Sequence, residues 1–424
     1  MDDLRKRLSR LGVTRGSEFK PKPAPAHEAR VEAVLDGHAL QTPIGELYEV
    51  AHTHPAASQR GPRQLADWLA QDARALANIS QLAADRLPAL NQFVFLDTET
   101  TGLGGAGALA FMVGIGYFNA ANDFEVRQFF LRHPGEEEAL LSLLPGLIPP
   151  HSALVTFNGR NFDVPLLATR YTLARQKTAL TALPNVDLLH PARRLWQRRL
   201  PSCALSALES DILGISRTHA DVPGMMIPEM YQRYLQTGDA RDMARVFYHN
   251  EQDILSMVAL AVVLTDAFTQ PALPALPVED RLSLARWYER LDMLADSETA
   301  YRLALDEAPN AELRHAALAQ FAALLKRLDR RDEVVPLWEY LADLKLDVSG
   351  HEELAKHYEW CQGDLNSAMA WTQQGIALAE SWRPGIRRVE ALSAFAHRRN
   401  RLERKLSGRL GETDSDQQIE SPEI

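Results

Sequence analysis

The sequence contains little cysteine, no long uninterrupted hydrophobic run and no excess of positive charge. Its 424 residues include two cysteines, Cys203 and Cys361, which lie far apart and without a C-x-x-C partner. This excludes a disulfide framework and a cysteine-based zinc site, and it indicates a reducing compartment. No apolar window reaches the length of a membrane span, and the first residues lack the apolar segment of a secretory signal. We therefore expect a cytoplasmic protein without a membrane partner.

The charge balance limits the ways in which the protein can bind nucleic acid. The formal net charge is −10, from 56 acidic residues against 46 lysines and arginines. This argues against a protein that coats nucleic acid through a broad basic surface, but an acidic enzyme can still hold a nucleic-acid end locally. With 46% hydrophobic and 24% charged residues, the composition is that of a globular protein. The length predicts two to three domains.

Shifts in composition divide the chain into six segments. Short apolar runs of β type alternate with helical patterns between residues 91 and 270, which predicts an α/β fold with a mixed sheet flanked by helices. Beyond a proline-rich break the pattern is entirely helical. The predicted segments are a basic flexible arm (1–34), an N-terminal extension with helices (35–90), the α/β domain (91–270), a proline-rich linker (271–279), an all-α helical-hairpin domain (280–407) and an acidic disordered tail (408–424).

The helical part carries a repeat signal. Small and aromatic positions have the spacing of a tetratricopeptide repeat, and the same four residue types or their aromatic equivalents recur about two repeats further along. The two sets are Ala285, Tyr288, Ser297 and Tyr301, then Ala355, Tyr358, Ser367 and Trp371. The spacing predicts about three helical hairpins that recruit a protein partner. An array that is only generically of this type is an equal alternative.

Two carboxylates follow the first apolar run of the α/β domain. Residues 93–96 are apolar, and Asp97 and Glu99 come directly after them. On a strand these side chains point to the same side, because side chains alternate with a period of two. Two like charges repel each other unless a cation compensates them, so the pair indicates a Mg²⁺ or Mn²⁺ site. The alternative is a pair of solvent-facing acids at a strand end, which is the usual meaning of a single Asp-x-Glu.

Two later segments supply further groups of the same kind. Residues 153–157 predict a short buried strand that leads through a polar turn to Asp163, near the start of a helix. Further on, His249 and Asp253 are four residues apart in a helical pattern, so they share one face of a helix. A two-metal phosphoryl-transfer site needs such carboxylates to hold the ions and a base for the attacking water.

Together these segments resemble the Exo I, II and III motifs of the DEDD (DnaQ-like) 3′→5′ exonucleases of the ribonuclease H-like superfamily. More of the chain resembles the YprB-like ribonuclease H-like proteins with C-terminal tetratricopeptide repeats. The resemblance covers residues 35–270 well and the helical part loosely, through motifs at residues 95–103, 186–196, 221–228 and 249–253. It implies a ribonuclease H-like sheet over 91–270 and metal-dependent 3′→5′ exonuclease activity on nucleic-acid ends, single-stranded ends in particular.

The resemblance also implies the residues of the active site. The carboxylates that would hold two Mg²⁺ or Mn²⁺ ions are Asp97, Glu99, Asp163 and Asp253. His249 would take the proton from the attacking water. Its spacing leaves this assignment open, because three residues separate His249 from Asp253 as in tyrosine-type members, whereas Tyr248 has the four-residue spacing of histidine-type members. For the substrate, the resemblance implies contacts at Leu103 and Asn158.

Three further features each have two interpretations. Residues 102–107 satisfy the G-x-G-x-x-G template for dinucleotides, but the carboxylates before them would repel a pyrophosphate and the next segment has a strand pattern. We therefore predict a tight connection there. Arg193 and Arg194 either grip substrate phosphates or lie on a solvated helix face around a buried Trp196. Asp187 either supports the metal site or caps a helix.

Two other functions stay open on the sequence alone. The main rival is a nucleic-acid-binding or scaffold protein, in which the nuclease fold is weakly active and the repeats bind a partner. A nicotinamide-dependent oxidoreductase is a more distant alternative. The enzyme is favoured because a cluster of like charges without a cation is costly. Whether the substrate is DNA or RNA is not decided, since no contact to a 2′-hydroxyl can be located in the sequence.

Overall fold

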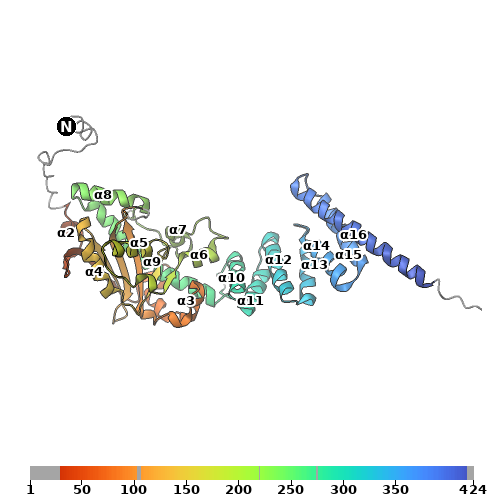
Figure 1. Cartoon of the computed structure of the whole chain (residues 1–424), viewed down its shortest axis with the longest axis horizontal. Helices are drawn as coiled ribbons and strands as arrows, with labels where there is room; N and C mark the ends of the chain where they lie inside the picture. The colour runs from red at the N-terminus through yellow and green to blue at the C-terminus, as the bar shows by residue number, and fades with distance from the viewer. Residues whose placement is uncertain (1–28, 103–106, 219, 274–275, 418–424) are drawn as a thin grey trace, which may run out of the picture. The chain divides into compact units, whose positions relative to one another are not determined.

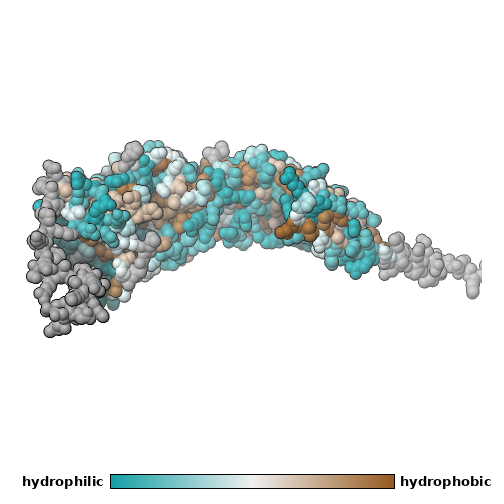
Figure 2. Space-filling view, turned by 90° about the horizontal axis from the view of Figure 1, so that it is seen from above, coloured by the Kyte–Doolittle hydropathy of each residue, from teal (hydrophilic) through white to brown (hydrophobic). Residues whose placement is uncertain are grey.

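The computed structural model describes residues 29–102, 107–218, 220–273 and 276–417, with side chains up to residue 407. It consists of two compact units that meet in sequence between Thr269 and Gln270 (Figure 1). The first unit is a mixed sheet flanked by helices, and the second is all-helical, as the sequence predicts. On the face seen in Figure 2, hydrophilic residues cover most of both units.

A seven-stranded sheet forms the centre of the first unit, in the order β1-β2-β7-β6-β5-β8-β9. β5, β6 and β7 form the predicted antiparallel meander, while β8 runs parallel to β5 and β9 runs parallel to β8. Its strands are β1 (His38–Gln41), β2 (Glu46–His54), β5 (Phe93–Thr100), β6 (Ala110–Phe118), β7 (Phe124–Phe130), β8 (Ala153–Thr156) and β9 (Asn185–Asp187). A separate hairpin consists of β3 (Gln59–Arg60) and β4 (Arg63–Gln64).

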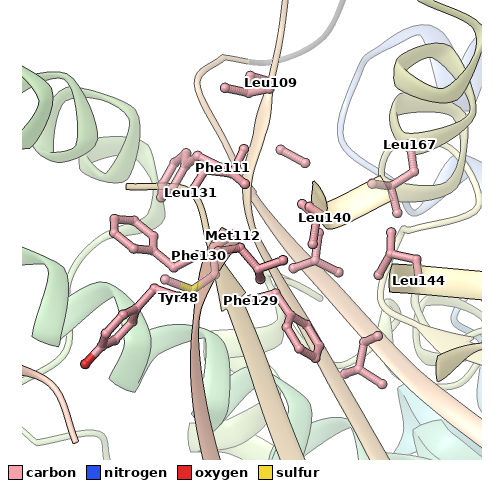
Figure 3. Close-up of a cluster of buried hydrophobic side chains, with 14 of the residues drawn as sticks. Tyr48, Leu109, Phe111, Met112, Phe129, Phe130, Leu131, Leu140, Leu144 and Leu167 are labelled. Atoms are coloured by element: carbon pink, nitrogen blue, oxygen red, sulfur yellow. The ribbon is translucent and has the colours of Figure 1, made fainter. Parts of the chain in front are cut away.

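Helices cover this sheet and fill its core. The α-helices of the first unit are α2 (Val31–Val34), α3 (Ala73–Ser80), α4 (Glu137–Leu147), α5 (Asp163–Leu173), α6 (Leu189–Trp196), α7 (Leu205–Leu208), α8 (Ile227–Thr237) and α9 (Arg241–Thr269). Leu140 and Leu144 of α4 gather with Phe129 of β7 in the buried cluster of Figure 3. On α8, Tyr231 stacks on Phe111 of β6 with 3.9 Å between ring centroids. Burying such large apolar side chains supplies most of the stability of the unit.

Short 3₁₀ or π turns connect these elements. They are η3 (Leu65–Ala70), η4 (Ala84–Arg86), η5 (Leu90–Gln92), η6 (Pro134–Glu136), η7 (Leu180–Ala182), η8 (Glu209–Leu213) and η9 (Gly224–Met226). The η8 turn is a single turn of π-helix that follows directly on α7. Such turns often mark functional positions, and η8 contributes to the site described below.

Helix α9 lies unusually close to the sheet. A Cβ atom at Gly114 would lie 2.1 Å from Asn250 Oδ1, and one at Gly116 would lie 2.6 Å from Ile254 Cγ2. Since Gly114 is the strand partner of Asp97, the two glycines let α9 bring its polar side chains next to the end of β5. Glycine in β6 is therefore a requirement of helix packing.

The same helix corrects one expectation from the sequence. By length and composition α9 can cross a membrane, so the statement that no segment reaches that length is wrong. Most of the helix is buried inside the protein: 72% of its most apolar window is covered, and Ile254, Met257 and Val258 are 0% exposed. Its apolar character is explained by its place as the core helix behind the sheet.

The predicted N-terminal boundaries also need correction. The segment over 35–90 contains η3 and α3, but its β1 and β2 belong to the main sheet, where β2 pairs with β7 from Tyr48 to His54. The pattern hid these strands because β2 is buried only over its first half, so its apolar residues are few. Ala29 and Val31, placed in the flexible arm, are buried in the structure. Residues 1–28 lie outside the described residues.

The second unit is a succession of helices that pack in chain order. They are α10 (Val278–Arg290), α11 (Leu294–Asp306), α12 (Ala311–Arg327), α13 (Arg331–Leu344), α14 (Ser349–His357), η10 (Tyr358–Gln362), α15 (Leu365–Glu380) and α16 (Ile386–Gln417). Buried Ser297 donates to the Ala285 carbonyl 2.9 Å away, which ties α11 to α10 at two of the repeat positions. The assignment to tetratricopeptide repeats and the protein partner stay predictions.

The end of the second unit differs from the predicted boundaries. Helix α10 begins within the segment assigned to the linker, and α16 continues through residues assigned to the disordered tail. Extending an existing helix costs far less than starting one, so the acidic residues after 408 can prolong α16 without a hydrophobic face. The last part of the predicted tail, 418–424, lies outside the described residues.

Candidate active site

Three chain segments bring four carboxylates together. Asp97 and Glu99 lie at the end of β5, Asp163 is the first residue of α5 after the loop that follows β8, and Asp253 lies on α9. The carboxyl ends of β5 and β8 meet at one edge because these strands are parallel neighbours. Glu99 and Asp163 are each only 9% exposed. The sequence predicts this set of carboxylates, and the structure places all four at the same edge of the sheet.

Electrostatic repulsion within this carboxylate cluster is strong. Burial raises the pKa of Asp97 well above its ordinary value, and the charges of Asp253 and Asp163 raise it further. Burial also raises the pKa of Glu99, with Asp97, Asp253 and Asp163 contributing in turn. Since each carboxylate is influenced by its neighbours, the four form one electrostatic unit that a cation would stabilise.

Polar neighbours hold two of these carboxylates in place. Asn250 Nδ2 donates to Asp97 Oδ2 at 2.7 Å, and Asn250 Oδ1 accepts from Gln128 Nε2 at 2.8 Å. Both amides are buried, so they form a fully paired chain from β7 through α9 to the end of β5. The Thr98 hydroxyl donates to Asp163. These contacts restrict the side-chain positions of Asp97 and Asp163.

Arg217 is the positive charge of the site, and sequence reasoning did not find it. Its guanidinium donates to Glu209 at 2.6 and 2.9 Å and also to Asp253. Glu209, on η8, is 1% exposed, and it also accepts from Arg60 at 3.3 Å and from Ser256. Two arginines thus neutralise one buried glutamate, and Arg217 extends its charge to a member of the carboxylate cluster.

His249 lies one helical turn from Asp253, as predicted, and has a further carboxylate partner. His249 Nε2 is 3.7 Å from Asp253 Oδ2, while His249 Nδ1 is 2.8 Å from Asp221 Oδ1 and 3.0 Å from an Arg217 nitrogen. With a proton on Nδ1, His249 would donate to Asp221 and leave Nε2 free to accept a proton, whereas Nδ1 without a proton would accept from Arg217. Tyr248, the alternative base, lies close enough to Arg60 to influence its pKa.

The donor set fits hard divalent cations, since Mg²⁺ and Mn²⁺ prefer carboxylate oxygens. Among the described residues, no group of three His, Cys, Asp or Glu side chains is already arranged to hold an ion. The contacts above explain why the carboxylates are not arranged around an ion, because Asp253 accepts a hydrogen bond from Arg217 and Asp97 accepts one from Asn250. An ion bound there would relieve the repulsion that adds to burial in raising the pKa values of Asp97 and Glu99.

Asp187 anchors the loop that leads to Asp163. Its carboxylate accepts from the backbone N–H groups of Asn158 at 2.8 Å, Arg160 at 3.1 Å and Leu189 at 3.1 Å. Asp187 thus bonds the first residue of α6 and also fixes the β8–α5 loop, while its support of a metal site stays a prediction. It is 4% exposed, so these bonds are shielded from water.

Replacing Asp187 with alanine should loosen this loop. Three backbone N–H groups lose their acceptor, and we expect a loss of about 2 kcal/mol in the free energy of unfolding. We also expect weaker Mn²⁺ binding, because Asp163 follows the loop. Chemical denaturation and Mn²⁺ titration measure the two effects. Asp187→Asn keeps one acceptor and should be intermediate; a variant equal to wild type in both measurements would refute the anchoring role.

The structure separates the predicted substrate residues. Arg193 is exposed and lines a cavity next to Asn158, whereas the neighbouring Arg194 turns inward and donates to the Ile79 carbonyl at 3.3 Å. Arg194 is therefore explained by its structural contact. Asn158 has a left-handed backbone with φ of 65°, which turns the chain sharply between β8 and α5. Leu103 lies outside the described residues.

Comparison with known proteins agrees with this geometry. Residues 94–265, which include the four carboxylates and His249, match the RNase H superfamily. The chain is 32% identical over 298 residues to the protein YprB of Bacillus subtilis strain 168, which covers 68% of this chain and 70% of that protein. The chain belongs to the YprB family of the RNase H superfamily. This fold is that of nucleic-acid hydrolases, which generally use divalent metal ions.

The YprB-family fold also decides the meaning of the glycine-rich segment. β5 is followed by β6, an antiparallel neighbour, and not by the helix that a dinucleotide fold requires. The template at residues 102–107 therefore does not belong to a dinucleotide fold, and residues 103–106 of the predicted tight connection lie outside the described residues. Asp221 and Asn250 belong to motifs of the family resemblance, which is the signal that could have singled them out. Arg217 and Glu209 carry no such signal in the sequence.

The carboxylate cluster should make the metal-free protein less stable as the pH rises. Burial raises the pKa of Asp163 from 3.8 to about 6. A raised pKa means that the folded state holds the proton more tightly than the unfolded state. The stability from this group is therefore full below its pKa in the unfolded state, and it is lost as the pH rises through its pKa in the folded state. As the pH rises from about 4 to about 7, we expect the ionisation of Asp163 to lower the free energy of unfolding by about 3 kcal/mol. Denaturant unfolding in metal-free buffer measures this.

Asp163→Asn is the matched variant for this pH effect. It keeps an oxygen that accepts from Thr98 but cannot ionise, so its unfolding free energy should fall less over the same pH range. The difference between wild type and variant isolates this carboxylate from all other titrating groups. Parallel pH profiles for the two proteins would contradict the expected ionisation.

Proposed function

We propose that this protein is a metal-dependent 3′→5′ exonuclease that hydrolyses phosphodiester bonds at nucleic-acid ends. The observation that carries the proposal is the convergence of four buried or half-buried carboxylates from β5, the start of α5 and α9, with a histidine beside them. The superfamily supports hydrolysis of nucleic acid. The 3′→5′ direction rests on the resemblance of the motifs around Asp97, Asp163 and Asp253 to those of DEDD exonucleases.

The carboxylates would hold two Mg²⁺ or Mn²⁺ ions. These ions would supply charge to stabilise the reacting phosphate and to lower the pKa of a bound water. Within the chain, Asp97 and Glu99 lie on β5, Asp163 begins α5 and Asp253 lies on α9, so three separate elements bring their carboxylates together. Asp253 would exchange its contact with Arg217 for a contact with an ion. After that exchange the Arg217 guanidinium would no longer contact Asp253, but it would stay paired with Glu209.

His249 is the proposed acceptor for the proton of the attacking water. Its Nε2 lies on the Asp253 side of the ring, while Asp221 holds Nδ1 at 2.8 Å on the other side. Asp221 therefore acts as a positioning residue that favours the tautomer with a free Nε2. The hydrogen bond from His249, together with the charge of Arg217, lowers the pKa of Asp221 against the effect of burial, so Asp221 stays ionised at neutral pH.

A product assay with labelled strands tests the proposal. Single-stranded and duplex DNA and single-stranded RNA, each labelled at the 3′ or at the 5′ end, are incubated with Mg²⁺ or Mn²⁺. We expect labelled mononucleotides as the first product of 3′-labelled strands and a shortening ladder from 5′-labelled strands. Internal fragments, or mononucleotides released first from the 5′ end, would contradict the proposed direction. A protein inert on every strand would support the alternative, a nucleic-acid-binding protein with a weakly active nuclease fold.

A further inference from the structure

A cavity lies beside the carboxylate cluster on the first unit. It measures about 700 Å³, which is within the range of small-molecule sites. Phe157 and Asn158 of the β8–α5 loop form one wall, and Arg193 and Gln197 of α6 and its end form the other. The segment that follows α6, which includes Cys203, also lines the cavity.

The β8–α5 loop lies between this cavity and the carboxylates: Asn158 lines the cavity, and the next residue, Gly159, lies beside Asp163. A Cβ atom at Gly159 would lie 2.9 Å from Asp163 Oδ2, so the loop backbone at Gly159 passes close to that carboxylate. The preceding residue, Asn158, lines the cavity. Asp187 holds the loop through the N–H groups of Asn158 and Arg160. A nucleic-acid strand whose end reaches Asp163 thus has this cavity next to it.

The lining of the cavity suits one nucleotide. None of the described residues that line it is acidic, although the protein carries a net charge of −10. Arg193 is exposed, and among the described residues no carboxylate pairs with it, so its guanidinium can donate hydrogen bonds to a phosphate. The side-chain amides of Asn158 and Gln197 can meet a base edge, and Phe157 offers a face for stacking.

We propose that this cavity binds the nucleotide that precedes the terminal one in a single strand, with Arg193 on its phosphate. This inference rests on the proposed function of the neighbouring carboxylates. It gives the enzyme a second nucleotide subsite on α6, which would hold the strand while the terminal phosphodiester is cleaved. The subsite is electrostatically favourable on an acidic protein because its single arginine has no competing acid in the lining.

The first test compares two neighbouring arginines in the full-length chain. A fluorescein-labelled single-stranded DNA of about ten nucleotides is titrated with wild type, Arg193→Ala and Arg198→Ala in Ca²⁺. We expect Arg193→Ala to weaken binding about fivefold to tenfold and to lower the salt slope by about one. Arg198 is exposed on the same segment but does not line the cavity, so its variant should bind like wild type. Equal affinities for wild type and Arg193→Ala would overturn the subsite.

A kinetic readout separates the subsite from the carboxylate cluster. The nitrophenyl ester of thymidine 5′-phosphate has no preceding nucleotide, so Arg193→Ala should hydrolyse it at the wild-type rate. On the labelled strand the same variant should show a raised KM and a kcat close to wild type. A lower rate of hydrolysis on both substrates would assign Arg193 to the reaction centre and overturn the proposal.

Cys203 allows the cavity to be filled in the folded protein. In a Cys361→Ser background, a bulky maleimide on Cys203 should weaken strand binding at least about tenfold and leave ester hydrolysis unchanged. Burial raises the pKa of the Cys203 thiol, so labelling is done at alkaline pH and confirmed by mass spectrometry. The double variant with Cys203→Ser, treated identically, is the control. Wild-type strand binding by the adduct would overturn the subsite.

The two proposals fail in different ways. If no substrate is cleaved but Arg193→Ala and the adduct still lose strand affinity, the exonuclease proposal fails and the nucleotide subsite stands. If cleavage is observed while both altered proteins bind the strand like wild type, the subsite is wrong and the exonuclease proposal stands.

Discussion

Replacing Asp97 with asparagine should lower the rate of strand cleavage at least about 10³-fold, which corresponds to about 4 kcal/mol of lost transition-state stabilisation. Burial raises the pKa of Asp97, and the charges of Asp253 and Asp163 raise it further, so Asp97 lies close to both of these carboxylates. Asparagine retains the oxygen that accepts from Asn250 but removes the charge that holds an ion. The loss is therefore chemical, and the fold should be intact.

The measurement is the initial rate of mononucleotide release in saturating Mn²⁺, with circular dichroism and thermal melting to confirm the fold. Glu125→Gln is the matched control, because Glu125 lies on β7 of the same sheet and accepts from the Tyr117 hydroxyl at 2.7 Å, outside the carboxylate cluster. It should cleave at the wild-type rate. An Asp97→Asn protein within tenfold of wild type would show that this carboxylate is not part of the reaction centre.

Removing Arg217 should have the largest effect on stability. Arg217→Met leaves Asp253 and the buried Glu209 without this cation, and breaking a buried pair on one side costs about 3 to 5 kcal/mol. We expect a loss of that size in the free energy of unfolding of metal-free protein at neutral pH. Added Mn²⁺ should restore part of it, because an ion compensates Asp253 but not Glu209.

Denaturant unfolding with and without Mn²⁺ measures this. Arg241→Met is the control, since Arg241 pairs with Asp239 at the surface and is 73% exposed, where ion pairs contribute little. Arg217→Lys keeps the charge but loses the two-pronged contact with Glu209, so it should fall between wild type and Arg217→Met. If Arg217→Met were as stable as Arg241→Met, Arg217 would not be the compensating charge of the site.

The sequence was sufficient to predict the carboxylate cluster and the core of the fold. Asp97 and Glu99 follow an apolar strand, so their common direction is a local consequence of strand geometry, and the relation of His249 to Asp253 follows from helical spacing. The meander of β5 to β7 was visible because its strands have dense apolar runs. Local patterns of this kind survive in any globular fold, which is why they could be interpreted.

Features that depend on contacts between distant segments could not be predicted. Arg217 and Glu209 look like ordinary surface charges in the sequence, and they meet only because η8 buries Glu209 beside α9, where Arg217 pairs with it. Arg193 and Arg194 are adjacent in the chain, and only the helix orientation shows that one lines the cavity while the other donates to Ile79. β2 joins the sheet through pairing with a strand about 75 residues away, a choice that no local pattern specifies.

Direct counting of bound Mn²⁺ tests the central claim, since it needs no knowledge of the substrate. Free Mn²⁺ is followed by electron paramagnetic resonance during titration of the metal-free full-length protein. The four carboxylates predict two ions per chain for wild type, and Asp97→Asn should lose at least one of them. A wild-type protein that binds no Mn²⁺ at millimolar concentration, or an Asp97→Asn variant that binds it as wild type does, would contradict a two-ion site at the end of β5.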